Sequence, residues 1–525
     1  MKKISFIASM ALVLLVTSCS KDLNQIPIST QTTATFYQQP SDFIQGINAA
    51  YNSLRNYPDR LLDMSEIRSD NIYPTNSVAR DPDAISNFST SIAGHPYVEE
   101  AWSTDFRGIF QANTVLDQIA KNGSFVGSAA LATRLSAEAR FLRAFYYFDL
   151  VRYFGKLPII DHPVSISEST TIGRSPVADV YTLIIADLQF AIANLPANYA
   201  GAFPSYTATD VGRATKYAAE AVLGQVYMTR SGPTYGISGP GLGLNEWSLA
   251  VPLFNDIINS GLFVFNTSYS NIFSYTNQSP NYTATGNREA IFDVMYLTGQ
   301  NPVLGADFTW QLIPQNYFNS QPAGNTPANG NLGTPSVSPN MLAEYSASDV
   351  RKTQNVFTAG YTYQGTLDPY PFFRKYVPYL GTGALDAAKI PASRFDWGIN
   401  FIAIRYTDIL MLKAECILNG APGNQLTDVD GVVNQVRNRA GLLPLVNVNA
   451  DQLLAERRRE FAAEGLRWFD LQRSGKLLTI MNAWKAVDDA VIQKMGPITA
   501  NSIIYPVPQS QLDTAPGLYS PNPGY

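Results

Sequence analysis

Residues 137–155 read AEARFLRAFYYFDLVRYFG, and this stretch decides the fold that we expect for the chain. Its apolar positions are 139, 141, 142, 144–148, 150, 151, 153 and 154. They are too many for one amphipathic stripe, so we expect a helix that neighbours cover on more than one side. Gly155, followed by Pro158, favours a helix end at this point. Such a helix predicts a protein built mainly from stacked helices.

The composition of the 525-residue chain indicates what its surface is like. Hydrophobic residues make up 46% of the sequence, which is ample for a core, and charged residues only 15%, well below the usual quarter. Tyr, Phe, Gly, Pro and neutral polar residues fill the difference, which suits an extracellular protein that handles uncharged polar ligands. The net charge of −5 gives no broad attraction to nucleic acid, so we expect no nucleic-acid partner.

The N-terminus has the pattern of a secretion signal. Two lysines precede an apolar run, Ile4–Val16, that is too short to span a membrane comfortably. The sequence Val16-Thr17-Ser18-Cys19 looks like a lipobox, in which the cysteine is acylated. We therefore predict a lipoprotein signal peptide at 1–18, and the acylated Cys19 with a polar tether at 19–35. The alternative is an ordinary signal peptide whose cysteine is incidental.

Helical segments follow one another along the chain and form pairs. The expected helices cover 41–55, 98–120, 130–154, 176–195, 213–230, 246–260, 401–418, 428–439 and 450–473. Within 213–230, LGQVY matches the Leu-Gly-x-x-Tyr signature of the first helix of a tetratricopeptide repeat, and Ala250 with Phe254 matches the second. Two further pairs join 137–155 to 176–195 and 401–418 to 428–439. The predicted fold is mostly α, a tetratricopeptide-like scaffold of about four helix pairs.

Residues 261–398 differ in composition from the helical parts. Gly, Pro, Asn, Ser and aromatic residues dominate there, with short strand-like runs at 290–297 and 360–363. Long loops with scattered aromatics are a common place for binding sites. We predict a loop-rich ligand-binding insertion between an N-terminal helical region, 36–260, and a C-terminal helical region, 399–525.

Two other stretches are predicted to lack helices. Residues 57–97 are rich in Asp, Asn, Pro and Ser, which favours loop structure. The chain beyond the last predicted helix reads as proline-rich coil, within which IIYPVP at 503–508 has the character of a buried segment.

The sequence lacks the motifs of common catalytic, cofactor and metal sites. Neither of its two histidines, His95 and His162, has a second ligand at metal spacing. No Gly-x-Ser-x-Gly, Walker A or Gly-x-Gly-x-x-Gly sequence occurs. Cys416 lies in an apolar helix and is expected to be a buried hydrophobic residue. We expect no enzymatic activity, metal or cofactor; the alternative, a secreted glycoside hydrolase, would need a carboxylate pair that no spacing identifies.

The segment ERRREFAAEGLRWFDLQRSGKL, residues 456–477, has two interpretations. In the first, Arg457–Arg459 form an anion site. In the second, which we favour, the arginines pair along the helix and with neighbouring elements, because Glu456, Glu460 and Glu464 recur at every fourth residue.

Four segments resemble the SusD/RagB family, and they occur in the family's order. They are RSDNIYP (68–74), AEARFLRAFYYFDLVRYFGKLPII (137–160), RYTDILMLKAECILNG (405–420) and ERRREFAAEGLRWFDLQRSGKL (456–477). Members are surface glycan-binding lipoproteins of Gram-negative outer membranes. The resemblance implies a tetratricopeptide scaffold with a loop-rich ligand-binding half and no catalysis. It also implies a partner, a SusC-like TonB-dependent transporter, to which the protein passes an oligosaccharide. Some members are proposed to bind peptides or glycoproteins, which is the main alternative.

The resemblance also suggests where a sugar would bind. In the starch-binding member the contacts come from loops that match 72–102 and 290–320 here. Sugar rings stack on aromatic side chains and their hydroxyls bond to polar ones. The candidate ligand contacts are Tyr73, Asn76, Arg80, Tyr97, Tyr296, Trp310 and Tyr317. Each aromatic has core packing as its alternative role, as does Trp102 in the expected 98–120 helix. Asp70 and Asn71 match the family pattern and have bracing of the loop as theirs.

Overall fold

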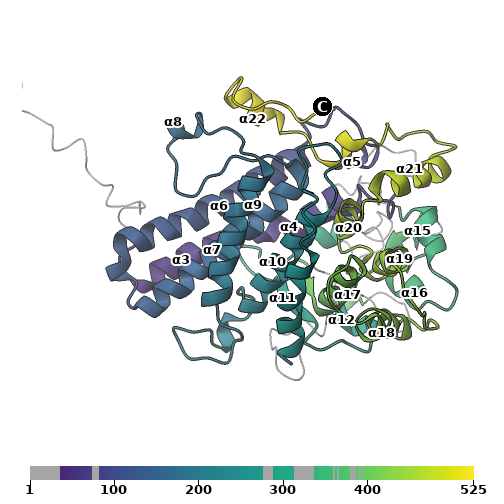
Figure 1. Ribbon diagram of the computed structural model, residues 1–525, viewed down its shortest axis with the longest axis horizontal. Helices are drawn as coiled ribbons and strands as arrows, with labels where there is room; N and C mark the ends of the chain where they lie inside the picture. The colour runs from purple at the N-terminus through teal and green to yellow at the C-terminus, as the bar shows by residue number, and fades with distance from the viewer. Residues whose placement is uncertain are drawn as a thin grey trace, which may run out of the picture.

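The computed structural model describes residues 36–73, 82–275, 288–312 and 336–525, apart from 359–360, 364–365, 379–385, 390, 392 and 394 (Figure 1). The predicted signal peptide, Cys19 and the tether lie outside the described residues. So do three candidate ligand contacts, Asn76, Arg80 and Tyr317.

Helices dominate the described chain, and the strands are short. The longer helices are α3 (Pro40–Asn52), α6 (Pro96–Asn122), α7 (Ala129–Phe154), α9 (Val177–Asn194), α10 (Lys216–Ser231), α11 (Trp247–Asn259), α17 (Tyr406–Leu418), α18 (Gly431–Arg439), α19 (Ala450–Phe461), α20 (Arg467–Ser474) and α21 (Leu477–Asp488). The shorter ones are α4 (Tyr57–Leu61), α5 (Asp83–Ser86), α8 (Ile166–Ser169), α12 (Tyr269–Ile272), α13 (Phe308–Gln311), α15 (Pro339–Glu344), α16 (Arg351–Asn355) and α22 (Gln509–Thr514).

The described strands form two-stranded antiparallel ladders. The pairs are β1 (Ala290–Val294) with β6 (Phe401–Arg405), β2 (Val356–Phe357) with β5 (Phe372–Phe373), and β3 (Tyr361–Tyr363) with β4 (Thr366–Asp368). The strands predicted at 290–297 and 360–363 are therefore confirmed, although each is shorter than predicted.

Helices that follow one another pack in pairs, as the sequence predicts. α3 lies against α6, α7 against α9, α10 against α11, and α17 against α18. Figure 1 shows α3, α6, α7 and α9 side by side, with α10 and α11 leading to the cluster of α17 to α21. The mostly α, tetratricopeptide-like scaffold is confirmed.

Helix α7 contains the stretch from which the fold was predicted. Every residue from 141 to 154 is buried, with α6 and α9 packed against the helix. The Ser128 hydroxyl caps its first turn by accepting a hydrogen bond from the Leu131 amide at 3.1 Å. Gly155 ends it at φ +71°, where an added Cβ would lie 2.0 Å from the Ser238 carbonyl oxygen. The helix is thus covered on more than one side, as predicted.

Helix α9 illustrates how apolar this scaffold is. Within the described residues it is the one helix whose length and composition would allow it to cross a membrane. It lies between α7 and α10, and its buried Asp187 carboxylate accepts two hydrogen bonds from the Arg143 guanidinium at 2.7 and 2.8 Å. These contacts make it a packed helix of the scaffold.

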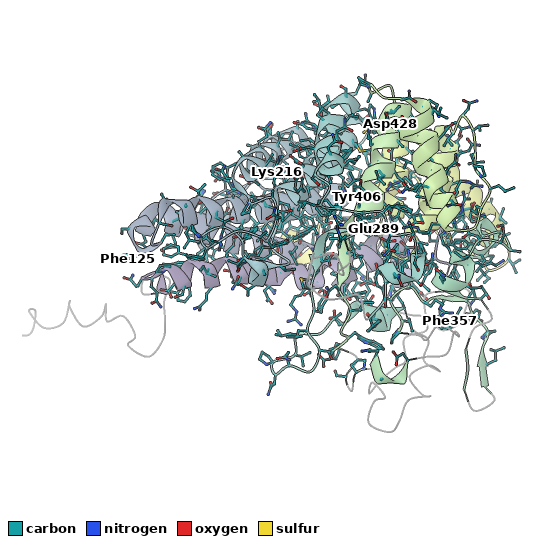
Figure 2. All side chains as sticks on the ribbon, turned by 90° about the horizontal axis from the view of Figure 1, so that it is seen from below. Phe125, Lys216, Glu289, Phe357, Tyr406 and Asp428 are labelled. Atoms are coloured by element: carbon teal, nitrogen blue, oxygen red, sulfur yellow. The ribbon has the colours of Figure 1, made fainter. Side chains whose placement is uncertain are left out.

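The prediction of one helix over 401–418 is wrong at its start. Residues 401–405 form strand β6, and α17 begins at Tyr406. The sequence FIAIR is rich in β-branched and aromatic residues, which fit a strand. The Tyr406 amide donates to the Glu289 carbonyl at 2.7 Å as the strand passes into the helix. Figure 2 shows both residues near the middle of the molecule, far from Phe125 at the end of the α6–α7 pair.

The helix predicted over 450–473 is two helices, α19 and α20. The turn between them has Ala463 at φ +66° and Gly465 at φ +73°. The Glu66 carboxylate accepts hydrogen bonds from both amides, at 2.7 and 3.1 Å. An added Cβ at Gly465 would lie 2.6 Å from the Leu61 Cβ. The helix is therefore interrupted here by close packing against Leu61 and by the bonds to Glu66, which is far away in the sequence.

The loop predicted over 57–97 is partly helical. α4 covers 57–61 and a further helical turn covers 62–66. Pro58 does not prevent this because it lies in the first turn, where a missing amide hydrogen costs nothing. The predicted C-terminal coil likewise contains α21 and α22, whereas the prediction that 503–508 is buried is confirmed.

Candidate functional site

The candidate site is a group of polar side chains beside α4, where the two predicted ligand-contact regions meet. We call this group the polar shelf; it comprises Asn56, Asp59, Glu100, Tyr296 and Gln311. Asn56 and Asp59 come from the start of α4, and Glu100 from the first turns of α6. Tyr296 follows β1, and Gln311 ends α13. The chain around α4 and α6 and the chain that follows β1 thus bring hydrogen-bond donors and acceptors to one place.

Hydrogen bonds fix the shelf in position. The Gln311 amide donates to Asp59 Oδ1 at 2.6 Å, and the Asn56 amide donates to Glu100 Oε1 at 2.5 Å. The Tyr296 hydroxyl donates to the Arg55 carbonyl at 2.6 Å. Arg55 in turn holds the segment after β1 through bonds from its guanidinium to backbone carbonyls at 303 and 305, both at 3.3 Å.

The buried carboxyl of Asp59 gives the shelf its electrostatic character. Burial, reinforced by the nearby Asp307, Asp63 and Glu100 carboxylates, raises the pKa of Asp59 well above its usual value. A carboxyl that keeps its proton can donate a hydrogen bond and carries no charge. Burial, together with the Asp59 and Asp307 carboxyls, raises the pKa of Tyr296, so its hydroxyl also stays neutral. The arrangement presents mainly neutral hydrogen-bonding groups.

The structure places the other candidate contacts differently. Tyr73 is only 1% exposed, its ring meets Trp484 edge-on, and its hydroxyl donates to Asp489 at 2.7 Å. The expectation that it contacts a ligand is corrected, because its ring has no accessible face. Tyr97 is half-buried beside His95 at the start of α6. Trp310 precedes Gln311 in α13, and its side chain lies outside what the structure describes.

Four shelf residues were not predicted from the sequence, and one of them, Asp59, lies within the stretch taken for loop. Asn56 lies next to the stretch taken for loop, and Glu100 and Gln311 lie within helices. Single polar residues of this kind carry no recognisable motif, so only their convergence identifies them. Trp102, by contrast, is 3% exposed and packs on Phe154. It therefore has the core-packing role that was given as its alternative.

The arginine-rich segment is structural. Arg457 binds Asp470 through two nitrogens at 2.9 Å, and Arg459 binds Glu344 at 3.0 Å. Arg458 donates to the side chain of Asn71 at 2.9 Å. The interpretation that these arginines pair with neighbouring groups is confirmed, and so is the bracing role of the 70–71 dipeptide.

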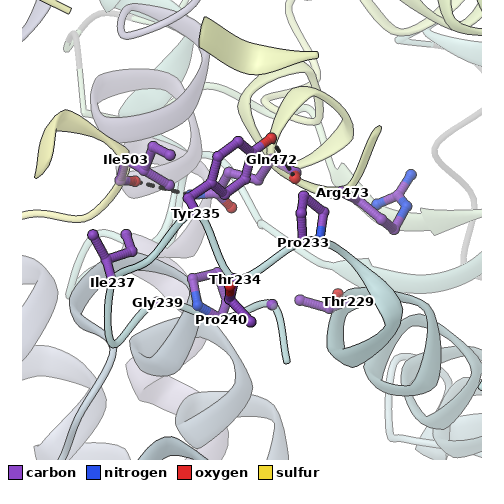
Figure 3. Close-up of a pocket in the computed structure, with 11 residues that line it drawn as sticks. Thr229, Pro233, Thr234, Tyr235, Ile237, Gly239, Pro240, Gln472, Arg473 and Ile503 are labelled. Carbon is purple, nitrogen blue, oxygen red and sulfur yellow. Dashed lines mark hydrogen bonds between the residues drawn. The ribbon is translucent and has the colours of Figure 1, made fainter. Parts of the chain in front are cut away.

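Three cavities of the structure differ in how well their volume and lining suit a ligand. The cavity in Figure 3, between the α10–α11 loop and α20, is about 10 Å³, which is space for one water. A pocket of about 350 Å³ adjoins the shelf at Arg55 and is lined by polar residues that include Asn52, Arg213 and Asp293. Burial raises the pKa of Asp293 to about 7. A third, mainly apolar pocket of about 220 Å³ lies next to it and shares Val211.

Comparison with known proteins gives consistent relatives for both halves of the chain. Residues 288–525 match the family model described as "SusD family", and residues 24–228 match the one described as "Starch-binding associating with outer membrane". A SusD-like protein of Bacteroides ovatus is 27% identical over 394 residues, which cover 71% of this chain and 64% of that protein.

Solved structures share the fold along almost the whole chain. Surface glycan-binding protein A from Bacteroides uniformis has a TM-score of 0.73 at 24% identity, covering 92% of this chain and all of that one. The protein of the same name from Bacteroides thetaiotaomicron, in complex with laminarihexaose, has a TM-score of 0.71 at 21% identity, covering 93% and 100%. With both halves matched in order and this fold, the chain belongs to the SusD/RagB family.

Proposed function

We propose that the protein is a non-catalytic, cell-surface lipoprotein of the outer membrane that binds an oligosaccharide and delivers it to a SusC-like TonB-dependent transporter. The observation that carries the proposal is the polar shelf, which gathers neutral donors and acceptors between the two segments where the family resemblance expects ligand contacts. Hydroxyl groups of an uncharged sugar are suitable partners for such a surface.

Fewer aromatic side chains are accessible to a ligand than the composition suggests. Among the side chains that the structure describes, every Tyr and Trp is buried or half-buried. The abundant aromatic residues therefore serve mostly as core. Of the predicted aromatic contacts, half-buried Tyr97 and Tyr296 are left to stack on a sugar ring, with Trp310 and Tyr317 as proposals.

A hydrolase is disfavoured by the geometry of the shelf. The perturbed carboxyl Asp59 lies beside the Asp307 carboxylate, whereas the paired carboxyls of glycosidases stand roughly 5–10 Å apart to admit a sugar and water. Asp59 is also 7% exposed, so its role on the shelf is to hold Gln311 in place and not to protonate a glycosidic oxygen. Incubation with polysaccharide should therefore leave the chain length of the polymer unchanged; shortened products would contradict the proposal.

Calorimetric titration against a panel of neutral polysaccharides, with peptides for comparison, tests the proposal directly. For a glycan that binds, Gln311→Ala should weaken affinity by about 5- to 30-fold, since a lost hydrogen bond in a buried setting costs about 1–2 kcal/mol. The matched control is Gln45→Ala, on the exposed face of α3, which should bind like the wild type. Binding only to peptides, or equal loss in both variants, would contradict the proposal.

The lipid anchor has its own test. Cys19→Ala should move the protein from the membrane fraction to the soluble fraction, because no acyl chain would then hold it. Cys416→Ala is the matched control, since Cys416 is fully buried in α17 and has no part in anchoring. Retention of the Cys19 variant in membranes would show that lipidation is not what holds the protein.

A further inference from the structure

A cleft near the C-terminal helices has the features of a second binding site. It has a volume of about 600 Å³ and lies among α15, α19, α20 and α21, which Figure 1 shows gathered at one end of the molecule. We call it the α21 cleft. It shares no lining residue with the polar shelf. Its volume falls within the range of about 300–1,000 Å³ that is usual for small-molecule pockets.

The floor of the cleft contains an unsatisfied donor. Arg467 binds the Asp70 carboxylate through Nε and Nη2, both at 2.8 Å, but its Nη1 has no hydrogen-bond partner. The side chain is only 5% exposed. Buried donors are nearly always paired, and an unpaired one costs about 1–3 kcal/mol. An acceptor oxygen supplied by a ligand would remove this cost.

The charges that line the cleft balance one another. Its cations are Arg458, Arg467 and Lys476, and its anions Asp70, Glu344 and Asp451. Each carboxylate is already paired: Asp70 with Arg467 at 2.8 Å, Glu344 with Arg458 at 3.4 Å, and Asp451 with Lys476. The adjacent Asp488 accepts hydrogen bonds from Trp484 and the Asn340 amide. The cleft therefore offers a donor without a net attraction for an ion.

The walls of the cleft are largely apolar. Leu454, Ile480, Trp484 and Val487 line it, and Val487 is 71% exposed. A ligand that fits such a space needs a hydrophobic face for the wall and oxygens for the floor. A sugar ring has both, with C–H groups on its faces and hydroxyls at its edge.

We propose that the α21 cleft binds a neutral, hydroxyl-rich ligand of the carbohydrate class, one of whose oxygens accepts a hydrogen bond from Arg467 Nη1. The proposal adds a second site to the one on the polar shelf and rests on the cleft alone. Two sites on one chain would let it hold a long glycan at separate points, which raises the effective concentration of each segment.

Saturation-transfer NMR on the full mature chain tests the proposal, with D-glucose, D-galactose and D-mannose as neutral probes and D-glucuronate as a charged one. Ala483→Trp fills the cleft from the exposed side of α21 without touching a buried ion pair. Ala486→Trp is the matched control, because residue 486 is exposed on the same helix but does not line the cleft. Circular dichroism checks that both variants fold.

The expected result is transfer to at least one neutral sugar that persists in Ala486→Trp and falls in Ala483→Trp to the level that the polar shelf alone gives. Gln311→Ala should retain the transfer that is lost in Ala483→Trp, since the shelf is a different site. No transfer to a neutral sugar, equal transfer in both tryptophan variants, or transfer to D-glucuronate alone would overturn the proposal. Loss in Gln311→Ala with none in Ala483→Trp would assign all binding to the shelf and overturn the cleft only.

Discussion

Helices α7 and α19 are buried to similar depths, but their surroundings differ in kind. α7 is enclosed mainly by aromatic and aliphatic groups, as when Phe145 meets the Tyr57 ring edge-on at 4.9 Å and the Phe292 ring at 5.8 Å. On α19, Glu456 and Glu460 are 0% exposed and are matched with arginines from other elements. Buried ion pairs occur in both halves, such as Arg143 with Asp187 and Arg60 with Asp149 at α7. At α7 they lie within a mainly aromatic and aliphatic surrounding, whereas at α19 ion pairs make up most of the buried contacts.

The difference matters because the two kinds of burial fail in different ways. An apolar core loses stability in proportion to the volume removed. A buried ion pair adds little net stability, but the loss of one partner leaves the other charge uncompensated, at a cost of about 3–5 kcal/mol. Arg405 is the centre of the charged half, since it binds Glu289, Glu460 and Glu464 at 2.9–3.0 Å. Loss of Arg405 should thus cost more stability than loss of a single aromatic or hydrogen-bond contact of α7.

The largest effect is expected from Arg405→Met. The substitution keeps most of the side-chain volume but leaves three buried carboxylates without their shared cation, so the free energy of unfolding should fall by about 3–5 kcal/mol. Urea denaturation measures this. Arg437→Met is the control, because Arg437 is 14% exposed and its partner Glu456 keeps Arg351 and Arg459; it should lose less than about 1 kcal/mol. Equal losses would show that Arg405 is not the centre of the buried ion-pair network.

The next largest effect is expected on the free energy of unfolding when the pH is lowered. Although burial acts in the opposite direction, Arg439 and Arg405 lower the pKa of Glu460 to about 2. A carboxylate with a lowered pKa contributes its full stability above its unfolded value, near pH 4, and loses it as the pH falls through the folded value. The loss should reach about 3 kcal/mol, at 1.36 kcal/mol for each pKa unit.

Urea denaturation at a series of pH values measures the acid effect. The decline between about pH 5 and pH 2 should be clearly shallower in Glu460→Gln, which has no proton to take up at this position. A slope in the variant as steep as in the wild type would show that other carboxylates dominate acid unfolding.

The smallest effect is expected within the aromatic half. The Tyr146 hydroxyl donates to the Ala50 carbonyl at 2.6 Å, so Tyr146→Phe removes one hydrogen bond and should cost about 1 kcal/mol in thermal or urea unfolding. Tyr217→Phe, on the half-buried face of α10, should cost close to nothing. If Tyr146→Phe approached the loss in Arg405→Met, α7 would depend on polar contacts as strongly as α19 does.

The same contrast explains what could be predicted from the sequence. The stretch at 137–155 specifies its helix and its burial locally, through apolar side chains and Gly155. The charged segment at 456–477 indicates that its arginines are paired, but the partners Asp70 and Glu344 lie more than a hundred residues away. No local pattern identifies such partners.

Boundaries were missed where tertiary contacts override local preference. FIAIR at 401–405 is a strand because β1 pairs with it, and the break before α20 exists because Glu66 and Leu61 occupy that space. The shelf could not be predicted residue by residue, since Asn56 and Gln311 become neighbours of the same site only in the fold. Tyr73 was misjudged because an aromatic in a loop-like sequence gives no sign of its burial.

The carboxylate of Glu66 has a consequence for how the chain folds. Its bonds to the amides of Ala463 and Gly465 join residues 397 and 399 positions apart, and Arg68 similarly reaches Tyr525 at the last position. Contacts of such long sequence separation slow folding, because the intervening chain must be ordered first. The scaffold therefore cannot complete these contacts until the C-terminal residues have been synthesised. A chain that stops before residue 463 would lack both amide partners of the Glu66 carboxylate and the segment that packs against Leu61, and proteases should degrade it.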